Sequence, residues 1–136
     1  MLKWKTTQYR KGNKYNARKT QGLTSGKLYD SKAERDRAEW LKAAEADGTI
    51  TNLIEHPQVQ LTKFHKYKPD FCYQEDGRLV FEDVKGAVTD RFRINCNLWR
   101  ERGPGVLRIS KRLYSSSKWS FKEIRPDTHD ETMWSP

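Results

Sequence analysis

An Asp-Gly pair at positions 76 and 77 separates two runs of β-forming residues. The first run covers residues 70–73 and the second residues 79–85, and both are rich in aromatic and branched side chains. Asp and Gly tolerate the positive φ angles that a two-residue hairpin turn requires. The pattern therefore predicts an antiparallel hairpin with "QEDG", residues 74–77, as its turn.

The second of these runs is expected to be an interior strand of a sheet. Successive side chains of a strand point to opposite faces. One face would carry Leu79, Phe81, Asp83 and Lys85, and the other Val80, Glu82 and Val84. Because apolar residues fall on both faces, neither face of this strand should be open to water.

Two helices are predicted on either side of the hairpin. The first runs from about Lys32 to Asp47, because Ser31 is a good N-cap, the interior is free of proline, and Gly48 follows the last turn. The second begins at Thr89 or Asp90 and ends at Gly103, with apolar residues at helical spacing.

The remaining β structure is less regular in sequence. The run after "GPG", residues 105–110, predicts a strand parallel to residues 79–85, which would complete a β-α-β unit. A further strand is expected near residues 58–63, after an extended piece interrupted by Pro57. The sequence from Lys111 onward supports no assignment.

Length and composition favour one small domain. The chain has 136 residues, of which 35% are hydrophobic and 33% charged, a balance that permits one core. We expect an arm at residues 1–27, a domain at 28–125 and a polar tail at 126–136. With no secretory signal or membrane span in the sequence, a cytoplasmic protein is expected.

Cysteines and histidines give little sign of a metal site. Cys72 and Cys96 form no CxxC or CxxH arrangement and are expected to be reduced core residues. His56, His65 and His129 have no ligand spacing, and structural or surface roles are favoured for them.

Positive charge is concentrated at the N-terminus, which favours a polyanionic partner. Residues 1–27 contain eight basic residues and no acidic residue, whereas the rest of the chain is nearly neutral. Trp4, Tyr9 and Tyr15 lie among these charges and could stack on bases. A solvated tail that only aids solubility is the alternative. The eight basic residues are Lys3, Lys5, Arg10, Lys11, Lys14, Arg18, Lys19 and Lys27.

The hairpin also places acidic residues where they could hold a metal ion. Asp70 opens one strand and Asp83 lies on the other, so their carboxylates can approach each other across the pair. Lys85 shares the face of Asp83, whereas Glu82 faces away. Magnesium prefers such carboxylate oxygens and activates water for attack on a phosphodiester. The Val84 carbonyl and the carboxylate of Glu34, on the core face of the first helix, are candidate further ligands.

The order of these motifs resembles the PD-(D/E)xK nuclease superfamily. "SKAE" on the first helix, "PDF", and "EDVKG" after the hairpin carry the resemblance, over about residues 28–110. It is greatest to small phage Holliday-junction resolvases of the endonuclease I type. The resemblance implies an α/β fold with a restriction-endonuclease-like core, α-β-β-β-α-β, in which helices flank a mixed sheet. One departure is Asp83, where the resolvases have Glu; the superfamily accepts either.

The resemblance also implies roles for individual residues. Asp70, Asp83 and Glu34 would hold Mg²⁺, for which Mn²⁺ could substitute, and Lys85 would position or activate the water. The product would carry a 5′-phosphate. The implied protein is a phage-encoded homodimer that cleaves branched DNA in the host cytoplasm. Besides the arm, the expected DNA-contacting residues are Arg108, Lys111, Arg112 and Lys118.

Other interpretations remain open at this stage. Glu34 with Ser31 has the spacing of a capping box, in which the glutamate serves the helix end. Lys85 could simply end a strand. The protein could also be a general or nicking endonuclease of the same fold, or a nucleic-acid-binding protein without catalysis.

Overall fold

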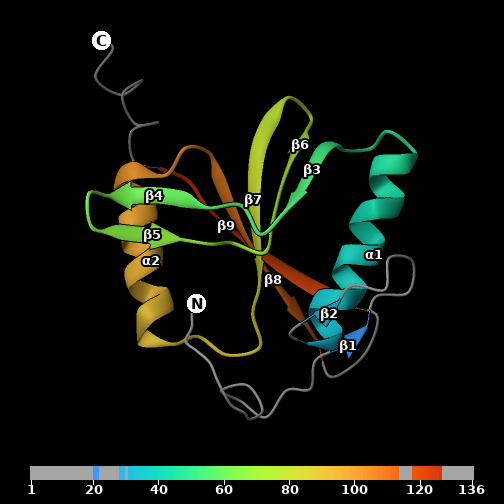
Figure 1. Cartoon of the computed structure of the whole chain (residues 1–136), viewed down its shortest axis with the longest axis horizontal. Helices are drawn as coiled ribbons and strands as arrows, with labels where there is room; N and C mark the ends of the chain where they lie inside the picture. The colour runs from blue at the N-terminus through green and yellow to red at the C-terminus, as the bar shows by residue number, and fades with distance from the viewer. Residues whose placement is uncertain (1–19, 22–27, 30, 114–117, 127–136) are drawn as a thin grey trace. The chain divides into compact units, whose positions relative to one another are not determined.

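The computed structural model describes residues 20–21, 28–29, 31–113 and 118–126 of the chain. The chain divides into two compact units, residues 1–41 and 42–136. In the first unit, β1 (Thr20–Gln21) pairs antiparallel with β2 (Leu28–Tyr29), and helix α1 (Lys32–Ala46) begins there (Figure 1). The eight basic residues of the predicted arm lie outside the described residues.

Helix α1 begins and ends close to the residues that its predicted N-cap and the following glycine indicate. The Ser31 hydroxyl oxygen accepts a hydrogen bond from the Glu34 backbone N–H at 3.1 Å, as an N-cap does. Gly48 follows the helix with φ of 86°, a left-handed conformation that suits glycine. In the second unit, the Glu45 carboxylate accepts from the Leu53 N–H at 2.9 Å and ties the end of α1 to the strand that follows.

The second unit is built on a mixed sheet of five strands (Figure 1). Within the described residues its order is β3-β6-β7-β8-β9, with β7 in the centre. The β7–β8 pair is parallel and the other pairs are antiparallel. The strands are β3 (Thr51–Glu55), β6 (Phe71–Glu75), β7 (Arg78–Val84), β8 (Val106–Arg112) and β9 (Trp119–Ile124).

The predicted hairpin is confirmed as β6 and β7. Asp76 and Gly77 form its turn with φ of 52° and 75°, the positive values expected for an Asp-Gly pair. Phe71 pairs with Glu82 and Glu75 with Arg78, so the register is continuous along the hairpin. The central position of β7 explains why apolar residues occur on both of its faces.

The predicted β-α-β unit is also confirmed. Helix α2 (Asp90–Arg102) connects β7 to β8, and β8 pairs parallel with β7. The Thr89 hydroxyl caps the helix by accepting from the Phe92 N–H at 3.1 Å. At the other end, the Gly103 N–H donates to the Trp99 carbonyl at 2.8 Å.

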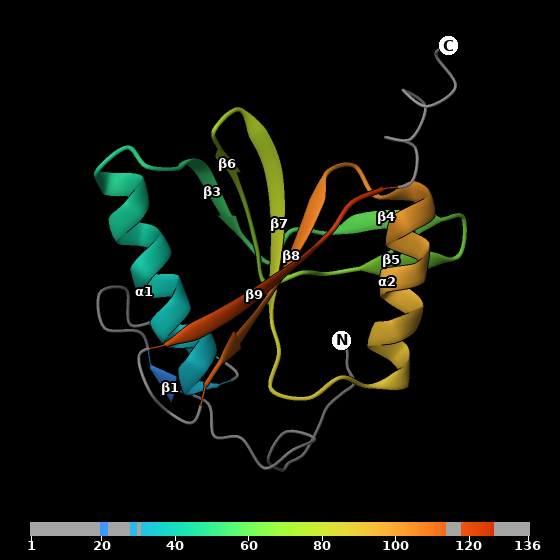
Figure 2. The same ribbon diagram turned by 180° about the vertical axis from the view of Figure 1, so that it is seen from behind.

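Three described strands of the second unit differ from the expectation. Residues 51–55, expected only as an extended piece, form the edge strand β3, and the unassigned C-terminal part supplies β9. The strand expected at residues 58–63 is β4 (Val59–Thr62), which pairs with an unpredicted strand, β5 (His65–Tyr67), as a separate hairpin. Figure 2 shows β9 running along β8 from the reverse side.

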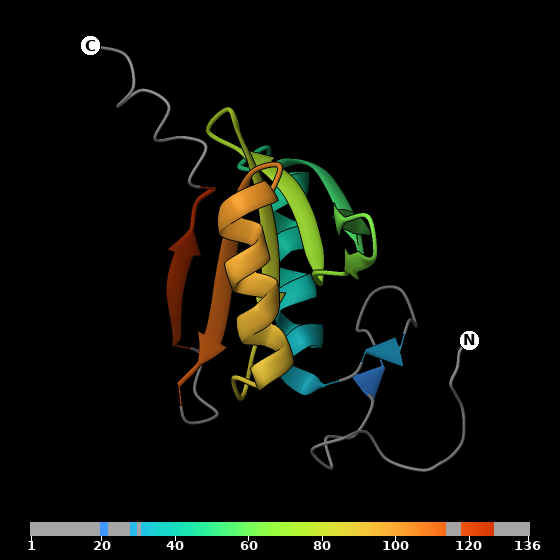
Figure 3. The ribbon, with the colours of Figure 1, turned by 90° about the vertical axis from the view of Figure 1, so that its left-hand side faces the viewer.

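The main apolar cluster of the described residues joins the sheet, α2 and the β4–β5 hairpin. Figure 3 shows α2 in front of the sheet. Trp99 is fully buried in this cluster, and its indole N–H donates to the Gly105 carbonyl at 2.8 Å. The ring of Phe81 lies edge-on to Trp99, with centroids 5.1 Å apart. The cluster also contains Val59, Leu61, Tyr67, Cys72, Phe92, Cys96, Leu107 and Ile124.

Both cysteines are free and buried, as predicted, and burial raises the pKa of each thiol. Among the described residues, none of the helices is both long and apolar enough to cross a membrane.

Candidate active site

Two aspartates face each other at one end of the β6–β7 hairpin. Phe71 pairs with Glu82, and one further step in the same register places Asp70 opposite Asp83. Asp83 is buried and Asp70 partly buried. One oxygen of Asp70, Oδ2, accepts from the Val84 backbone N–H at 2.8 Å. The carboxylate of one strand is therefore tied to the backbone of the other.

These aspartates line a pocket of about 420 Å³ that has an acidic interior and a basic rim. Lys85, the first residue after β7, lines it as well, together with the exposed Lys66, Lys68 and Arg91. The remaining lining residues are Tyr67, Thr89, Phe92 and Asn95. A pocket with this charge distribution can hold a cation inside and bind phosphate oxygens at its edge.

Asp83 is held by two neighbours that contact the same oxygen. The Tyr67 hydroxyl donates a hydrogen bond to Oδ2 of Asp83, and the Lys85 ammonium lies 3.4 Å from that oxygen. Lys85 also lies over the Phe92 ring, 4.6 Å from its centroid. Burial, and then the charge of Asp83, raise the pKa of Tyr67, so this hydroxyl stays protonated and remains a donor.

Glu82 lies on the opposite face of β7, as the strand alternation predicts. Its carboxylate is fully buried and accepts hydrogen bonds from the Tyr73 hydroxyl at 2.5 Å and from the Ser110 hydroxyl at 2.6 Å. Glu82 does not line the pocket that Asp83 and Lys85 share. Of the two adjacent acids, Asp83 is thus the one available to a ligand there.

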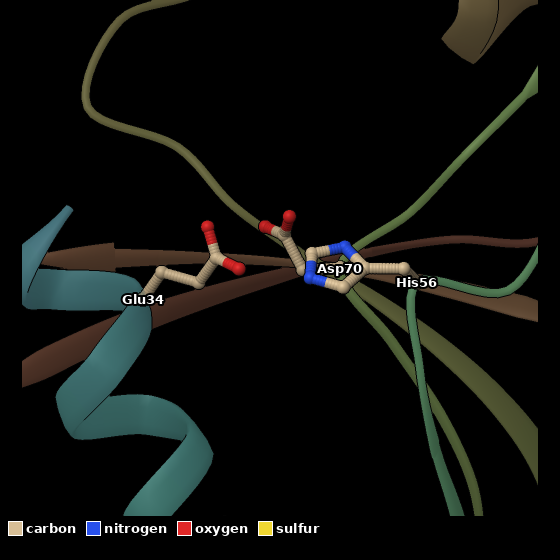
Figure 4. A group of neighbouring side chains, drawn as sticks. All are labelled: Glu34, His56 and Asp70. Atoms are coloured by element: carbon tan, nitrogen blue, oxygen red, sulfur yellow. The ribbon is translucent and has the colours of Figure 1, made fainter. Parts of the chain in front are cut away.

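His56 lies beside Asp70 and brings an imidazole ring close to its carboxylate. Its backbone N–H donates to the Asp70 carbonyl at 2.8 Å, and a ring nitrogen lies within 4.8 Å of an Asp70 carboxylate oxygen. Figure 4 shows these two side chains, together with Glu34 from the first turns of α1. Glu34 is buried, and it belongs to the unit that ends at Leu41. Its place at the site stays a prediction.

Comparison with known proteins identifies a family but no activity. A family model described as "Protein of unknown function (DUF1064)" matches residues 12–126. The chain belongs to this family. No curated protein and no solved structure matches the chain.

Four of the DNA-contacting residues predicted for this DUF1064 member belong to the described residues, and none of them lines the pocket. They are Arg108, Lys111, Arg112 and Lys118. Arg108 is engaged elsewhere, because its guanidinium lies 2.8 Å from carboxylate oxygens of both Glu75 and Glu123. The hydrogen bond from Arg108 holds the pKa of Glu123 at about 2. Lys111 and Lys118 are exposed, and Arg112 lies over the Trp119 ring, 5.2 Å from its centroid.

Several pocket residues of this DUF1064 chain were missed by sequence reasoning. Tyr67 contacts Asp83 although the two are 16 residues apart. Lys66 and Lys68 flank Tyr67 in "KYKPD", immediately before Asp70, and Arg91 follows the cap of α2. Two lysines bracketing a tyrosine next to a candidate ligand were the available signal.

Proposed function

We propose that this chain is a Mg²⁺-dependent endonuclease that hydrolyses phosphodiester bonds in DNA. The observation that carries the proposal is the convergence of Asp70, Asp83 and Lys85 in one pocket, at the adjoining ends of two neighbouring strands. Carboxylates that meet from different elements, with an ammonium group beside them, form a minimal site for metal-assisted phosphodiester hydrolysis.

The element order supports the finer fold assignment. With the β4–β5 hairpin set aside, the order α1-β3-β6-β7-α2-β8 has the pattern α-β-β-β-α-β. We therefore propose a restriction-endonuclease-like core in which β4–β5 is an insertion and β9 an addition. The acidic pair lies where β6 begins and β7 ends.

The donor atoms fit magnesium. Among the described residues, the Tyr67 hydroxyl and the Lys85 ammonium both contact Oδ2 of Asp83, and we propose Oδ1 as its oxygen for a cation. Asp70 would supply a second carboxylate oxygen, and the Val84 carbonyl and Glu34 complete the proposed ligand set. Carboxylate and carbonyl oxygens suit Mg²⁺ and also Mn²⁺, which would substitute for it.

The resemblance to the PD-(D/E)xK nucleases gives Glu34 the role of a carboxylate carried by the first helix. We propose that this side chain provides the third carboxylate.

The bound metal and the basic side chains of the pocket would share the remaining steps, which are activation of the water and binding of the phosphates. A bound Mg²⁺ would lower the pKa of a water molecule and neutralise charge on the phosphate. Lys66, Lys68 and Arg91 at the rim would bind flanking phosphates, and Lys85 would hold the attacked phosphate or the water. Attack in line with the leaving oxygen would break the bond to the 3′-oxygen and leave a 5′-phosphate.

The substrate and assembly follow from the resemblance to phage resolvases. We propose branched DNA as the substrate and a homodimer, because resolution of a four-way junction requires two symmetrical cuts. A phage-encoded enzyme of this kind would act in the host cytoplasm.

Cleavage assays test the proposal. Wild type should cut a synthetic four-way junction in the presence of Mg²⁺ but not in EDTA, whereas Asp70→Asn, Asp83→Asn and Lys85→Ala should each lose at least about 100-fold in rate. Glu34→Gln should raise the Mg²⁺ concentration that gives half-maximal cutting in the same assay.

Asp76→Asn is the matched control, because Asp76 lies on the same hairpin but at its exposed turn. Circular dichroism would verify that each variant folds. A wild type that binds DNA without cutting it would instead support the non-catalytic nucleic-acid-binding protein, and equal cutting of junction and linear duplex would support a general endonuclease.

A further inference from the structure

Phe64 is far more exposed than any other large apolar residue that the structure describes. Its exposed fraction is 89%, against 54% for Ile54 and Val88. It lies in the turn between β4 and β5, in the hairpin that sequence reasoning did not predict. An aromatic ring exposed to this degree at a hairpin tip has a free face that a partner could contact.

The turn that carries Phe64 is held in place by its own side chains. The Gln60 amide donates to the Thr62 carbonyl at 2.6 Å, and the Phe64 N–H donates to the Thr62 hydroxyl at 3.2 Å. His65, next to Phe64, lies 2.6 Å from the Asn95 side-chain oxygen and so tethers the hairpin to α2.

The base of the hairpin is anchored as well. Val59, Leu61 and Tyr67 are buried in the main apolar cluster with Phe92 and Trp99. Because both the base and the turn are fixed, the Phe64 ring is presented to solvent from a rigid support. A preorganised ring loses little conformational entropy when it binds.

The charge around the ring favours a polyanion. Residues 56–69 contain no Asp or Glu, but they contain Lys63, Lys66 and Lys68. The Lys63 ammonium lies 5.5 Å from the centre of the Phe64 ring. An aromatic ring beside phosphate-binding cations is the arrangement by which proteins bind exposed nucleotides.

The hairpin also leads directly into the candidate active site. Lys66, Tyr67 and Lys68, which follow Phe64, line the pocket that contains Asp70 and Asp83. Asp70 lies six positions after Phe64, so an extended chain places them at most about 20 Å apart. That distance corresponds to about six nucleotide steps of a DNA duplex.

We infer that Phe64 stacks on an exposed base at the branch point of the DNA substrate and thereby selects branched over fully paired DNA. In an intact duplex each base already stacks on its neighbours, so the ring has no face to contact. Unpaired or splayed nucleotides at a branch offer such a face. This inference rests on the proposed function, because the ring acts on the strand whose phosphate enters the pocket.

Fluorescence of 2-aminopurine tests the stacking. A four-way junction with 2-aminopurine at the branch point is titrated with protein in EDTA, so that no cleavage occurs. Wild type should change the emission on binding. Phe64→Ala should abolish that change and raise the Kd for the junction roughly 5- to 150-fold, the range expected for loss of one stacked base.

Further variants test whether the effect requires an aromatic ring rather than any apolar side chain, and whether it requires the ring at position 64 rather than another exposed ring. Phe64→Trp should retain the fluorescence change, and Phe64→Leu should lose it. Phe121→Ala, at a half-exposed ring on β9, is the matched control and should leave the junction Kd within about twofold. The Kd of linear duplex should also stay within about twofold in Phe64→Ala.

The outcomes distinguish this inference from the nuclease proposal. Unchanged junction binding and fluorescence in Phe64→Ala would overturn the role of Phe64 even if wild type cuts DNA. An equal loss of affinity for junction and duplex would overturn the selection of branched DNA. Loss of the emission change in Phe64→Ala, with no Mg²⁺-dependent cutting by wild type, would support the stacking contact and reject the nuclease.

Discussion

The hydroxyl of Tyr67 connects the candidate active site to the core of the protein. The ring is buried and lies edge-on to Trp99 with centroids 6.0 Å apart, while the hydroxyl donates to Asp83. A buried carboxylate needs such donors, since an unsatisfied one is costly. In the proposed enzyme, Tyr67 would be a positioning residue, which orients Asp83.

Tyr67→Phe should lower the free energy of unfolding at neutral pH. Above pH 10, the free energy of unfolding should fall less steeply in Tyr67→Phe than in wild type. Removal of the donor to Asp83 should lower the free energy of unfolding by roughly 1–3 kcal/mol at pH 7. Burial raises the pKa of Tyr67 above its ordinary value of 10.0. A group with a raised folded pKa stabilises the protein fully below the unfolded pKa, and that stability is lost as pH rises above about 10.

Urea denaturation of both proteins from pH 7 to pH 11 measures these effects. The difference between wild type and Tyr67→Phe should shrink as the pH rises above 10, because only wild type loses the contribution of this hydroxyl. A difference that stays constant across the range would contradict the assigned hydrogen bond.

At the scale of elements, the β6–β7 hairpin places the site, because its turn sets the register that brings Asp70 opposite Asp83. The Asp-Gly turn and the alternation along β7 are local signals, and so the hairpin and the face of Asp83 could be predicted. The β4–β5 hairpin could not, because its short strands are stabilised by contact with α2 rather than by a strong pattern of their own.

Gly77→Ala should destabilise this hairpin by about 1 kcal/mol, since φ at Gly77 is 75° and a Cβ is strained there. Gly86→Ala is the matched control. An added Cβ meets no atom within 4 Å at either position, and Gly86 has no left-handed φ. Thermal unfolding of both variants checks the prediction, and equal melting temperatures would contradict it.

At the scale of the whole molecule, the charge distribution predicts how salt would affect the proposed binding of DNA. Deletion of residues 1–27 removes eight basic residues from a chain with a net charge of +9. Binding should weaken, and the slope of log Kd against log salt should fall by up to about 7 if all eight contact phosphates of duplex DNA. Fluorescence anisotropy at several NaCl concentrations measures the slope.

Deletion of the polar residues 127–136 is the control for this truncation and should leave the slope unchanged. An unaltered slope after removal of residues 1–27 would mean that the arm is not a DNA contact. The pocket rim would then be left as the main source of the salt dependence.

Local sequence determined the two helices, the β6–β7 hairpin, the parallel strand β8 and the shared face of Asp83 and Lys85. Each of these depends on caps, turn residues or spacing within a short stretch of chain. Only the tertiary structure decided that Tyr67 holds Asp83, that Lys66, Lys68 and Arg91 surround the pocket, and that Arg108 is paired with Glu75 and Glu123. Those contacts join residues from different elements, and no local pattern specifies which elements meet.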